Sequence, residues 1–137
     1  MPLLFDMPVE QLESYQGTNP KPDDFDTYWD IALAEMQALD PQVDLAPADF
    51  QSAIADCYDL WFTGVGGARV HAKFLRPKEA TEPHPALLMF HGYSGSAGSW
   101  SDKLGYVAQG CSVAALDCRG QGGLSEDVGG VKGWTLR

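Results

Sequence analysis

Long apolar runs, paired cysteines and an excess of basic charge are all missing from this sequence of 137 residues. No stretch approaches the roughly 20 apolar residues that cross a bilayer, and the first residues carry neither the basic start nor the apolar run of a signal peptide. Cys57, Cys111 and Cys118 show no C-x-x-C spacing, which favours free thiols over disulfides or a zinc site. We therefore expect a cytoplasmic protein that has no membrane partner.

Basic residues are scarce, since nine lysines and arginines face 19 acidic side chains for a net charge of −10. Proteins bind phosphate backbones through lysine and arginine, so this balance argues against a nucleic-acid partner. The charge is unevenly spread. Residues 1–59 hold 13 acidic side chains and one basic one, Lys21, whereas residues 60–137 hold six acidic and eight basic ones. The first part is predicted to be a solvated acidic cover, and the chemistry is expected in the second.

The N-terminal part contains one clear helical pattern. Its apolar positions recur at helical spacing and stop at a proline: Phe25, Trp29, Ala32, Met36, Leu39, then Pro41. A shorter helix fits residues 8–15. Residues 41–56, with two prolines, are predicted to be an irregular linker. We take residues 1–56 as an acidic helical N-terminal extension and residues 57–137 as the first part of an α/β domain.

After the linker the apolar period changes from helical to alternating. Residues 58–63 and 68–76 are predicted strands joined by a glycine turn, so we expect an antiparallel hairpin. Residues 86–90 form a continuous apolar run, typical of a strand that is covered on both faces. A helix over residues 99–109 and a second buried strand over residues 112–117 follow. This succession implies a right-handed crossover and a parallel pair of strands.

Two loops follow the carboxyl ends of the predicted parallel strands, at residues 91–98 and 118–125. Ligands of open α/β sheets bind beyond these ends. The first loop is rich in glycine and serine, which lets backbone N–H groups turn toward a developing negative charge, as an oxyanion hole requires. A plain strand-to-helix turn is the alternative that the composition leaves open.

Two motifs in these loops carry a resemblance to a known family: His91-Gly92-Tyr93 and Arg119-Gly120-Gln121. Together with residues 7–12 and 24–29, they resemble the acetyl xylan esterase / cephalosporin C deacetylase family (carbohydrate esterase family 7) over nearly the whole chain. The resemblance implies an α/β-hydrolase fold. It also implies a serine esterase that deacetylates acetylated xylo-oligosaccharides and similar small acetyl esters, cephalosporin C among them. A homo-oligomer, typically a hexamer, is a further implication.

The resemblance also assigns roles to the motif residues. Tyr93 matches the position whose backbone N–H serves the oxyanion hole, and its ring would line the acyl pocket. The remaining motif residues brace the site rather than attack the substrate: His91, Gly92, Arg119, Gly120 and Gln121. The planar five-donor head of Arg119 suits the tying of loop carbonyls or a carboxylate. No cofactor is implied, and no cluster of His, Cys and carboxylates has the spacing of metal ligands.

A serine esterase of this fold needs a Gly-x-Ser-x-Gly elbow, and the sequence contains none. Ser94 and Ser125 both lack the second glycine of that pattern. His71, His84 and His91 are predicted to be structural or exposed rather than the base of a catalytic triad. By resemblance the Ser, Asp and His of the triad all lie downstream of this chain.

The chain is therefore expected to be the N-terminal piece of a longer esterase and to be inactive by itself. In the hydrolase sheet the strand order begins 1-2-4-3-5, so an absent strand should lie beside residues 86–90, and the open apolar edge invites aggregation. The remainder is expected in the same polypeptide or in a cleaved second chain, unless the gene itself is truncated. The polar end, Thr135-Leu136-Arg137, suits a trypsin-like nick in an exposed loop. Open alternatives are a peptidase or dienelactone-type hydrolase of the same fold, and a non-catalytic binding or assembly module.

Overall fold

A computed structural model of the chain describes residues 7–128. Residues 1–6 and the predicted nick site at Thr135-Leu136-Arg137 lie outside the described residues. The chain divides into two compact units, with the boundary between Ala34 and Glu35. Within the described range, no helix combines the length and the apolar character needed to cross a membrane.

The N-terminal unit holds one helical turn, α1 (Val9–Leu12), and most of α2 (Phe25–Gln37). Asp26 lies in the first turn of α2, where the helix dipole favours negative charge, and it pairs with Lys21 at 2.6 Å. The apolar stripe of α2 forms as predicted but is exposed: Phe25, Trp29 and Met36 are 44%, 49% and 51% accessible. The described residues therefore leave this stripe largely uncovered.

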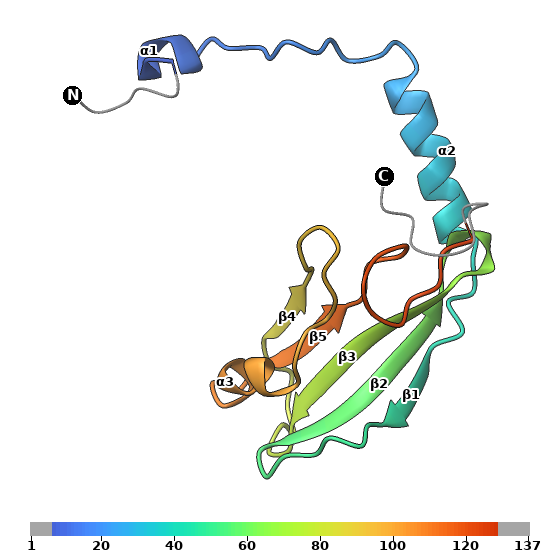
Figure 1. Cartoon of the computed structure of the whole chain (residues 1–137), viewed down its shortest axis with the longest axis vertical. Coiled ribbons are helices and arrows are strands. Elements are labelled where there is room, and N and C mark those ends of the chain that lie inside the picture. Colours follow the sequence, from blue (N-terminus) through green and yellow to red (C-terminus); the bar gives the residue numbers. More distant parts are fainter. Residues whose placement is uncertain (1–6, 129–137) are drawn as a thin grey trace. The chain divides into compact units, whose positions relative to one another are not determined.

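The second unit is built on one five-stranded sheet in the order β1-β2-β3-β5-β4 (Figure 1). Its strands are β1 (Asp44–Pro47), β2 (Ala55–Thr63), β3 (Arg69–Pro77), β4 (Ala86–Met89) and β5 (Ser112–Leu116). The predicted hairpin is confirmed in the antiparallel β2–β3 pair, and the predicted parallel pair in β4–β5. With β1 set aside, this order is the 1-2-4-3 order of the α/β-hydrolase sheet, which confirms the expected fold class.

Residues 41–56 are not the irregular linker that their prolines predict. β1 pairs antiparallel with β2, from Asp44 opposite Trp61 to Pro47 opposite Tyr58. All four residues of β1 are exposed, and an edge strand tolerates proline because the missing N–H need not face a partner strand. Pro41 and Pro47 therefore led to the prediction of a linker where the structure has an edge strand. The division into an extension of residues 1–56 and a domain of residues 57–137 stays a prediction.

One row of apolar side chains crosses the sheet and forms the centre of the core. Cys57 lies opposite Leu75, Leu75 opposite Val113, and Val113 opposite Leu87. The first three side chains are fully buried. Val107 of α3 (Leu104–Val107) packs on the same cluster. Removing this apolar surface from water is worth about 25 cal/mol per Å², and it holds α3 against the sheet.

The crossover between β4 and β5 is less helical than predicted. A 3₁₀ turn (Ser101–Lys103) leads into the single turn of α3, in place of a continuous helix over residues 99–109. Gly105 within α3 lowers helix propensity by roughly 1 kcal/mol relative to alanine. Gly110, at φ +84°, then ends the helical segment.

β4 is an edge of the described sheet, where its one partner is β5. Leu87 and Met89 pack against the core, whereas Leu88 and Phe90 are 63% and 65% exposed. The prediction of a strand covered on both faces is therefore wrong for the described residues, because the core and α3 cover one face only.

Candidate functional site

Two loops lie side by side beyond the carboxyl ends of β4 and β5. Because β4 and β5 are parallel neighbours, residues 91–98 and residues 117–125 leave the sheet at the same edge, where open α/β sheets bind their ligands. Three hydrogen bonds join the first loop to the second: His91 to Cys118, Ser94 to Gln121, and Ala97 to Asp117.

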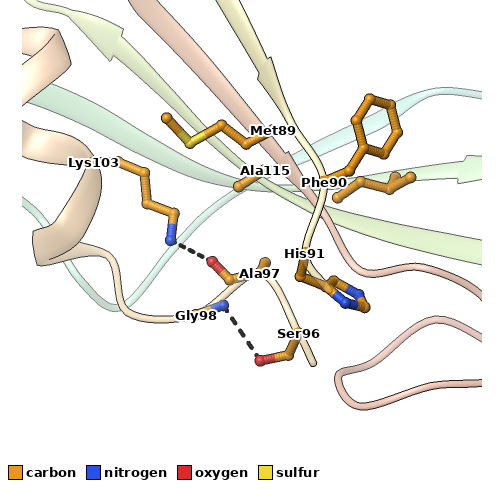
Figure 2. Close-up of a pocket in the computed structure, with 9 residues that line it drawn as sticks. Met89, Phe90, His91, Ser96, Ala97, Gly98, Lys103 and Ala115 are labelled. Carbon is orange, nitrogen blue, oxygen red and sulfur yellow. Dashed lines mark hydrogen bonds between the residues drawn. The ribbon is translucent and has the colours of Figure 1, made fainter. Parts of the chain in front are cut away.

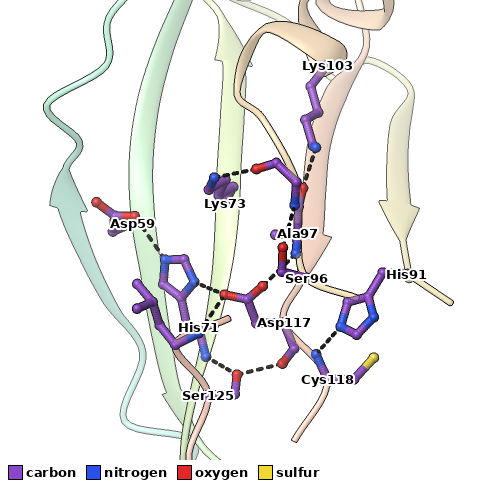
Figure 3. Close-up of polar contacts among 12 residues, drawn as sticks. Asp59, His71, Lys73, His91, Ser96, Ala97, Lys103, Asp117, Cys118 and Ser125 are labelled. Carbon is purple, nitrogen blue, oxygen red and sulfur yellow. Dashed lines mark hydrogen bonds and ion pairs between the residues drawn. The ribbon is translucent and has the colours of Figure 1, made fainter. Parts of the chain in front are cut away.

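His91 joins the two loops where they leave the sheet (Figure 3). The Cys118 N–H donates to His91 Nε2 at 2.9 Å, and His91 Nδ1 lies 2.7 Å from the carbonyl oxygen of Gly92. A ring nitrogen that accepts from an amide carries no proton, so we assign the proton to Nδ1, which donates to Gly92. The side chain of His91 thus connects loop to loop through backbone groups.

The second connection fixes a tight turn. The Ser94 N–H donates to Gln121 Oε1 at 2.6 Å. Ser94 has φ +56°, a conformation that non-glycine residues adopt when their surroundings hold them there. Gly95 N–H turns back to the Gly92 carbonyl. Gly122 approaches this turn so closely that a Cβ atom on it would lie 2.6 Å from Gly95 O, so only glycine fits there.

Tyr93 lies between these two connections. Tyr93 is 72% exposed. Within the described range no group accepts a hydrogen bond from its backbone N–H. An amide held by its neighbours, with its hydrogen free, is what an oxyanion hole requires. The role of Tyr93 as that donor stays a prediction.

Arg119 connects the second loop to the β2–β3 turn. Its guanidinium donates to the Val65 carbonyl oxygen at 2.8 Å and to Asp127 Oδ1 at 3.3 Å. Val65 begins the short 3₁₀ turn (Val65–Gly67) that the sequence predicts as a glycine turn. Gly120, at φ +68°, then redirects the chain toward Gln121. The Arg119-Gly120-Gln121 motif thus binds the Val65 carbonyl, the Asp127 carboxylate and the Ser94 N–H. These contacts are in keeping with a bracing role.

Asp117 directly follows β5, is 2% exposed, and binds three segments of the chain. Its Oδ1 accepts from the Ala97 N–H at 2.5 Å. Its Oδ2 accepts from the Leu124 N–H at 3.1 Å and lies 2.6 Å from His71 Nδ1. Burial by itself raises the pKa of this carboxyl, but the hydrogen bonds from His71 and the two amides outweigh burial, so the pKa of Asp117 is lowered. Asp117 is therefore held as a carboxylate inside the fold.

His71 of β3 is fully buried between two carboxylates (Figure 3). Its Nδ1 faces Asp117 and its Nε2 lies 2.9 Å from Asp59 Oδ1, with the Trp61 ring 4.7 Å away. Burial works against the charged ring, but both carboxylates favour it and raise the pKa of His71. Both ring nitrogens of His71 are occupied, so this residue is not placed to take a proton from a serine. This agrees with the prediction that His71 is not the base of a catalytic triad.

Ser125 completes this network. Its Oγ donates to the Asp117 carbonyl oxygen at 2.5 Å and accepts from the His71 N–H at 2.8 Å. Asp59, His71, Asp117 and Ser125 are not recognisable as a group in the sequence, because they come from three separate segments: β2, β3 and the loop after β5. One signal was available: Asp117 ends a buried strand, and a buried carboxylate requires donors.

Two lysines bind consecutive carbonyls at the end of the first loop. Lys103 Nζ donates to the carbonyls of Ala97 and Ser99, and Lys73 Nζ donates to the carbonyl of Gly98. Lys103 is 6% exposed, and burial lowers its pKa. The two ammonium groups hold this part of the loop against β3 and the crossover.

A cavity of about 210 Å³ opens beside the first loop (Figure 2). Its lining comes from the ends of β4 and β5, the loop and the crossover: Met89, Phe90, His91, Ser96, Ala97, Gly98, Lys103, Ala115 and Leu116. Ligand pockets commonly measure about 300–1,000 Å³, so this cavity has the size of part of a site. Between residues 7 and 128, no three His, Cys, Asp or Glu side chains are grouped to hold a metal ion.

Comparison with known proteins gives a consistent set of relatives. The sequence model of the family "Acetyl xylan esterase (AXE1)" matches residues 1–137. The chain is similar to the solved structure of acetyl xylan esterase 1 from Thermoanaerobacterium sp. JW/SL YS485. The two are 58% identical with a TM-score of 0.87, over 97% of this chain and 42% of the other.

Two further relatives are more distant. The acetyl xylan esterase from Paenibacillus sp. R4 is 32% identical with a TM-score of 0.78, over 95% of this chain and 44% of its own. Dipeptidyl-peptidase 5 of Schizosaccharomyces pombe (strain 972 / ATCC 24843) is 28% identical over an alignment of 103 residues that covers 69% of this chain and 14% of that protein. The chain thus spans less than half the length of either solved relative.

Proposed function

The chain belongs to the acetyl xylan esterase (AXE1) family, and we propose that it is the N-terminal segment of a serine esterase. The proposed substrates are acetylated xylo-oligosaccharides and similar small acetyl esters, including esters like that of cephalosporin C. The observation that supports this most is the placement of Tyr93. Its N–H lies between the His91–Cys118 and Ser94–Gln121 hydrogen bonds, beyond the carboxyl ends of two parallel strands.

In the proposed reaction this segment supplies an oxyanion donor. As a serine oxygen bonds to the acetyl carbon, the carbonyl oxygen gains negative charge and accepts a hydrogen bond from the Tyr93 N–H. One such donor contributes about 3–4 kcal/mol to the transition state. The base takes the serine proton and passes it to the sugar oxygen as that oxygen leaves; water, deprotonated by the same base, then attacks the acetyl-enzyme and releases acetate. The serine, aspartate and histidine are proposed to lie beyond this chain, so residues 1–137 alone are inactive.

The exposed edge of β4 is where we place the remainder of the enzyme. β4 is the edge strand of the described sheet, with Leu88 and Phe90 exposed on its uncovered face, and the hydrolase order puts the next strand, which carries the nucleophile elbow, beside it. That strand belongs either to the same polypeptide or to a cleaved second chain. Its pairing would satisfy the free backbone N–H and C=O groups of β4 and bring the serine toward the Tyr93 loop.

A cytoplasmic location and a homo-oligomer are part of the proposal. The described cysteines, Cys57, Cys111 and Cys118, are all free thiols, which suits a reducing compartment. The hexamer rests on the family resemblance. Light scattering on the complete polypeptide tests the assembly, and cell fractionation tests the location.

Acetate release by the complete polypeptide tests the activity. We expect release from p-nitrophenyl acetate and acetylated xylobiose, and no cleavage of dipeptide amides in the same preparation. Cleavage of peptides without acetate release would favour a peptidase, and inactivity on both would favour a binding module. A fluorophosphonate probe with mass spectrometry locates the nucleophile. We expect one labelled serine outside residues 1–137, whereas a label on Ser94 or Ser125 would contradict the proposal.

A further inference from the structure

The buried histidine of β3 has no part in the proposed chemistry, yet it touches the group that fixes the far end of the Tyr93 loop. Asp117 Oδ1 holds the Ala97 N–H, and Asp117 Oδ2 lies 2.6 Å from His71 Nδ1. Figure 3 shows the resulting line of contacts from Asp59 through His71 and Asp117 to Ala97. The backbone of the loop that carries Tyr93 is thus connected to β2 and β3 by three side chains, in addition to the direct contact of Lys73 with Gly98.

Lys103 binds the Ala97 carbonyl, and the orientation of the Asp117 carboxylate decides whether the Ala97 N–H is also held. A carboxylate can rotate about its Cβ–Cγ bond, and a rotation would break the 2.5 Å bond to Ala97. His71 Nδ1 and the Leu124 N–H both donate to the opposite oxygen, Oδ2, and so resist the rotation. His71 itself is held by Asp59 at Nε2 and by the ring of Trp61.

We propose that His71 is a positioning residue of the esterase: its Nδ1–H orients the Asp117 carboxylate, which fixes the loop that presents the Tyr93 N–H to the oxyanion. This inference rests on the proposed function. Positioning matters because a misplacement of about 1 Å in a catalytic group can cost about 100-fold in rate. A donor that acts on the oxyanion acts in the transition state, so its displacement lowers kcat more than it raises KM.

Two substitutions at the same residue separate positioning from mere folding. In His71→Asn the side-chain amide nitrogen falls near the place of Nδ1 and can still donate to Asp117. In His71→Gln the amide nitrogen falls near the place of Nε2, so it can donate to Asp59 but leaves Asp117 Oδ2 without that donor. Both variants shorten or reshape a fully buried side chain, so both are expected to lose stability to a similar degree.

The assay is acetate release from acetylated xylobiose by the complete polypeptide, with active sites titrated so that kcat refers to folded enzyme. We expect His71→Asn to keep kcat within about fivefold of wild type and His71→Gln to lose about 10- to 100-fold, with KM changed less than threefold. Equal kcat in the two variants, or the reverse order, would overturn the inference. An inactive wild type would refute the proposed function instead, so the two failures are distinguishable.

A second pair of variants keeps the test decisive if the His71 variants do not fold. Gly123 has φ +108°, and a Cβ on it would lie 2.3 Å from the Asp117 carboxylate carbon; Gly110 has φ +84°, and its Cβ would meet nothing within 4 Å. Alanine at either position carries a left-handed backbone penalty of about 1–2 kcal/mol, but only Gly123→Ala displaces Asp117. We expect kcat of Gly123→Ala to fall at least about tenfold below that of Gly110→Ala. Equal values in this pair would overturn the inference.

Discussion

The Ser94 N–H donates to Gln121 Oε1 at 2.6 Å, between residues 27 positions apart in the sequence. Ser94 directly follows Tyr93, and Gln121 belongs to the loop after β5. The position of the proposed oxyanion donor is therefore set by a side chain from another loop. Substitutions beyond β5 should change the rate of the reaction without touching the substrate.

Removing the Gln121 side chain should lower the rate. In the complete polypeptide, Gln121→Ala frees the Ser94 amide and relaxes a turn that has positive φ. We expect a loss of about 10- to 100-fold in kcat, with little change in KM. Gln109→Ala is the matched control, because Gln109 caps only the Gly105 carbonyl on the exposed side of α3, and it should keep wild-type kcat. Equal rates for the two variants would contradict the role of Gln121.

A methyl group on Gly122 should displace the Tyr93 turn. Its Cβ would lie 2.6 Å from Gly95 O, whereas a Cβ on Gly105 of α3 would meet nothing within 4 Å. We expect Gly122→Ala to lower kcat by about tenfold or more. Gly105→Ala should leave kcat unchanged and raise stability slightly, since alanine is the better helix former. A crystal structure of Gly122→Ala with the turn unmoved would be evidence against this account.

Replacing Arg119 by lysine should destabilise the fold. The planar guanidinium donates to Val65 O and Asp127 Oδ1 at once, and a single ammonium cannot reproduce both directions. We expect a loss of about 1–2 kcal/mol in the free energy of unfolding, measured with urea on the complete polypeptide. Arg76→Lys serves as the control, because the Arg76 guanidinium donates to a single carbonyl oxygen, that of Ala80, in an exposed hydrogen bond. If Arg119→Lys loses no more unfolding free energy than the control, the paired contacts of the Arg119 guanidinium with Val65 and Asp127 do not stabilise the fold.

The stability that His71 provides should depend on pH. Since the pKa of His71 is raised by folding, its contribution is fully present below the ordinary histidine pKa of about 6.5 and is lost as the pH rises through the raised value. Since the pKa of Asp117 is lowered, its contribution is present above about 3.9 and is lost as the pH falls through the lowered value. The difference in unfolding free energy between wild type and His71→Asn should therefore be largest between about pH 4 and 6.5 and shrink toward pH 9.

Urea unfolding of the complete polypeptide across that range checks the trend. Asp59→Asn provides the internal comparison, because the Asp59 carboxylate helps to raise the pKa of His71. In an Asp59→Asn background folding raises the pKa of His71 less, so the decline should be smaller and should end at a lower pH. A difference that is flat from pH 5 to 9, or that grows with pH, would contradict a protonated His71 in the folded protein.

The sheet could be predicted because its strands carry local signals. Alternation in residues 68–76 and the apolar runs at residues 86–90 and 112–117 set the strands, and the resemblance set their order. β1 was missed because Pro41 and Pro47 signal a loop, and an exposed edge strand has no apolar pattern to counter that signal. The helix over residues 99–109 was overestimated because spacing does not count the cost of Gly105.

Only the part of the candidate site that contains a family motif could be predicted from the sequence. The motifs at residues 91–93 and 119–121 identified the two loops that the structure brings together. The Asp59–His71–Asp117 contacts join residues 12 and 46 positions apart, and their pairing follows from β2, β3 and β5 being neighbours in the sheet. A sequence without the sheet register cannot show that one histidine faces two carboxylates.

The most direct test of the central claim is the distance from Tyr93 N to the oxyanion in a crystal structure of the complete polypeptide, trapped as a tetrahedral methylphosphonate adduct. We expect the Tyr93 N–H to donate to the oxyanion at about 2.7–3.1 Å, with the Ser94–Gln121 and Ala97–Asp117 hydrogen bonds intact. An oxyanion more than about 4 Å from Tyr93 N, beyond any hydrogen bond, would contradict it.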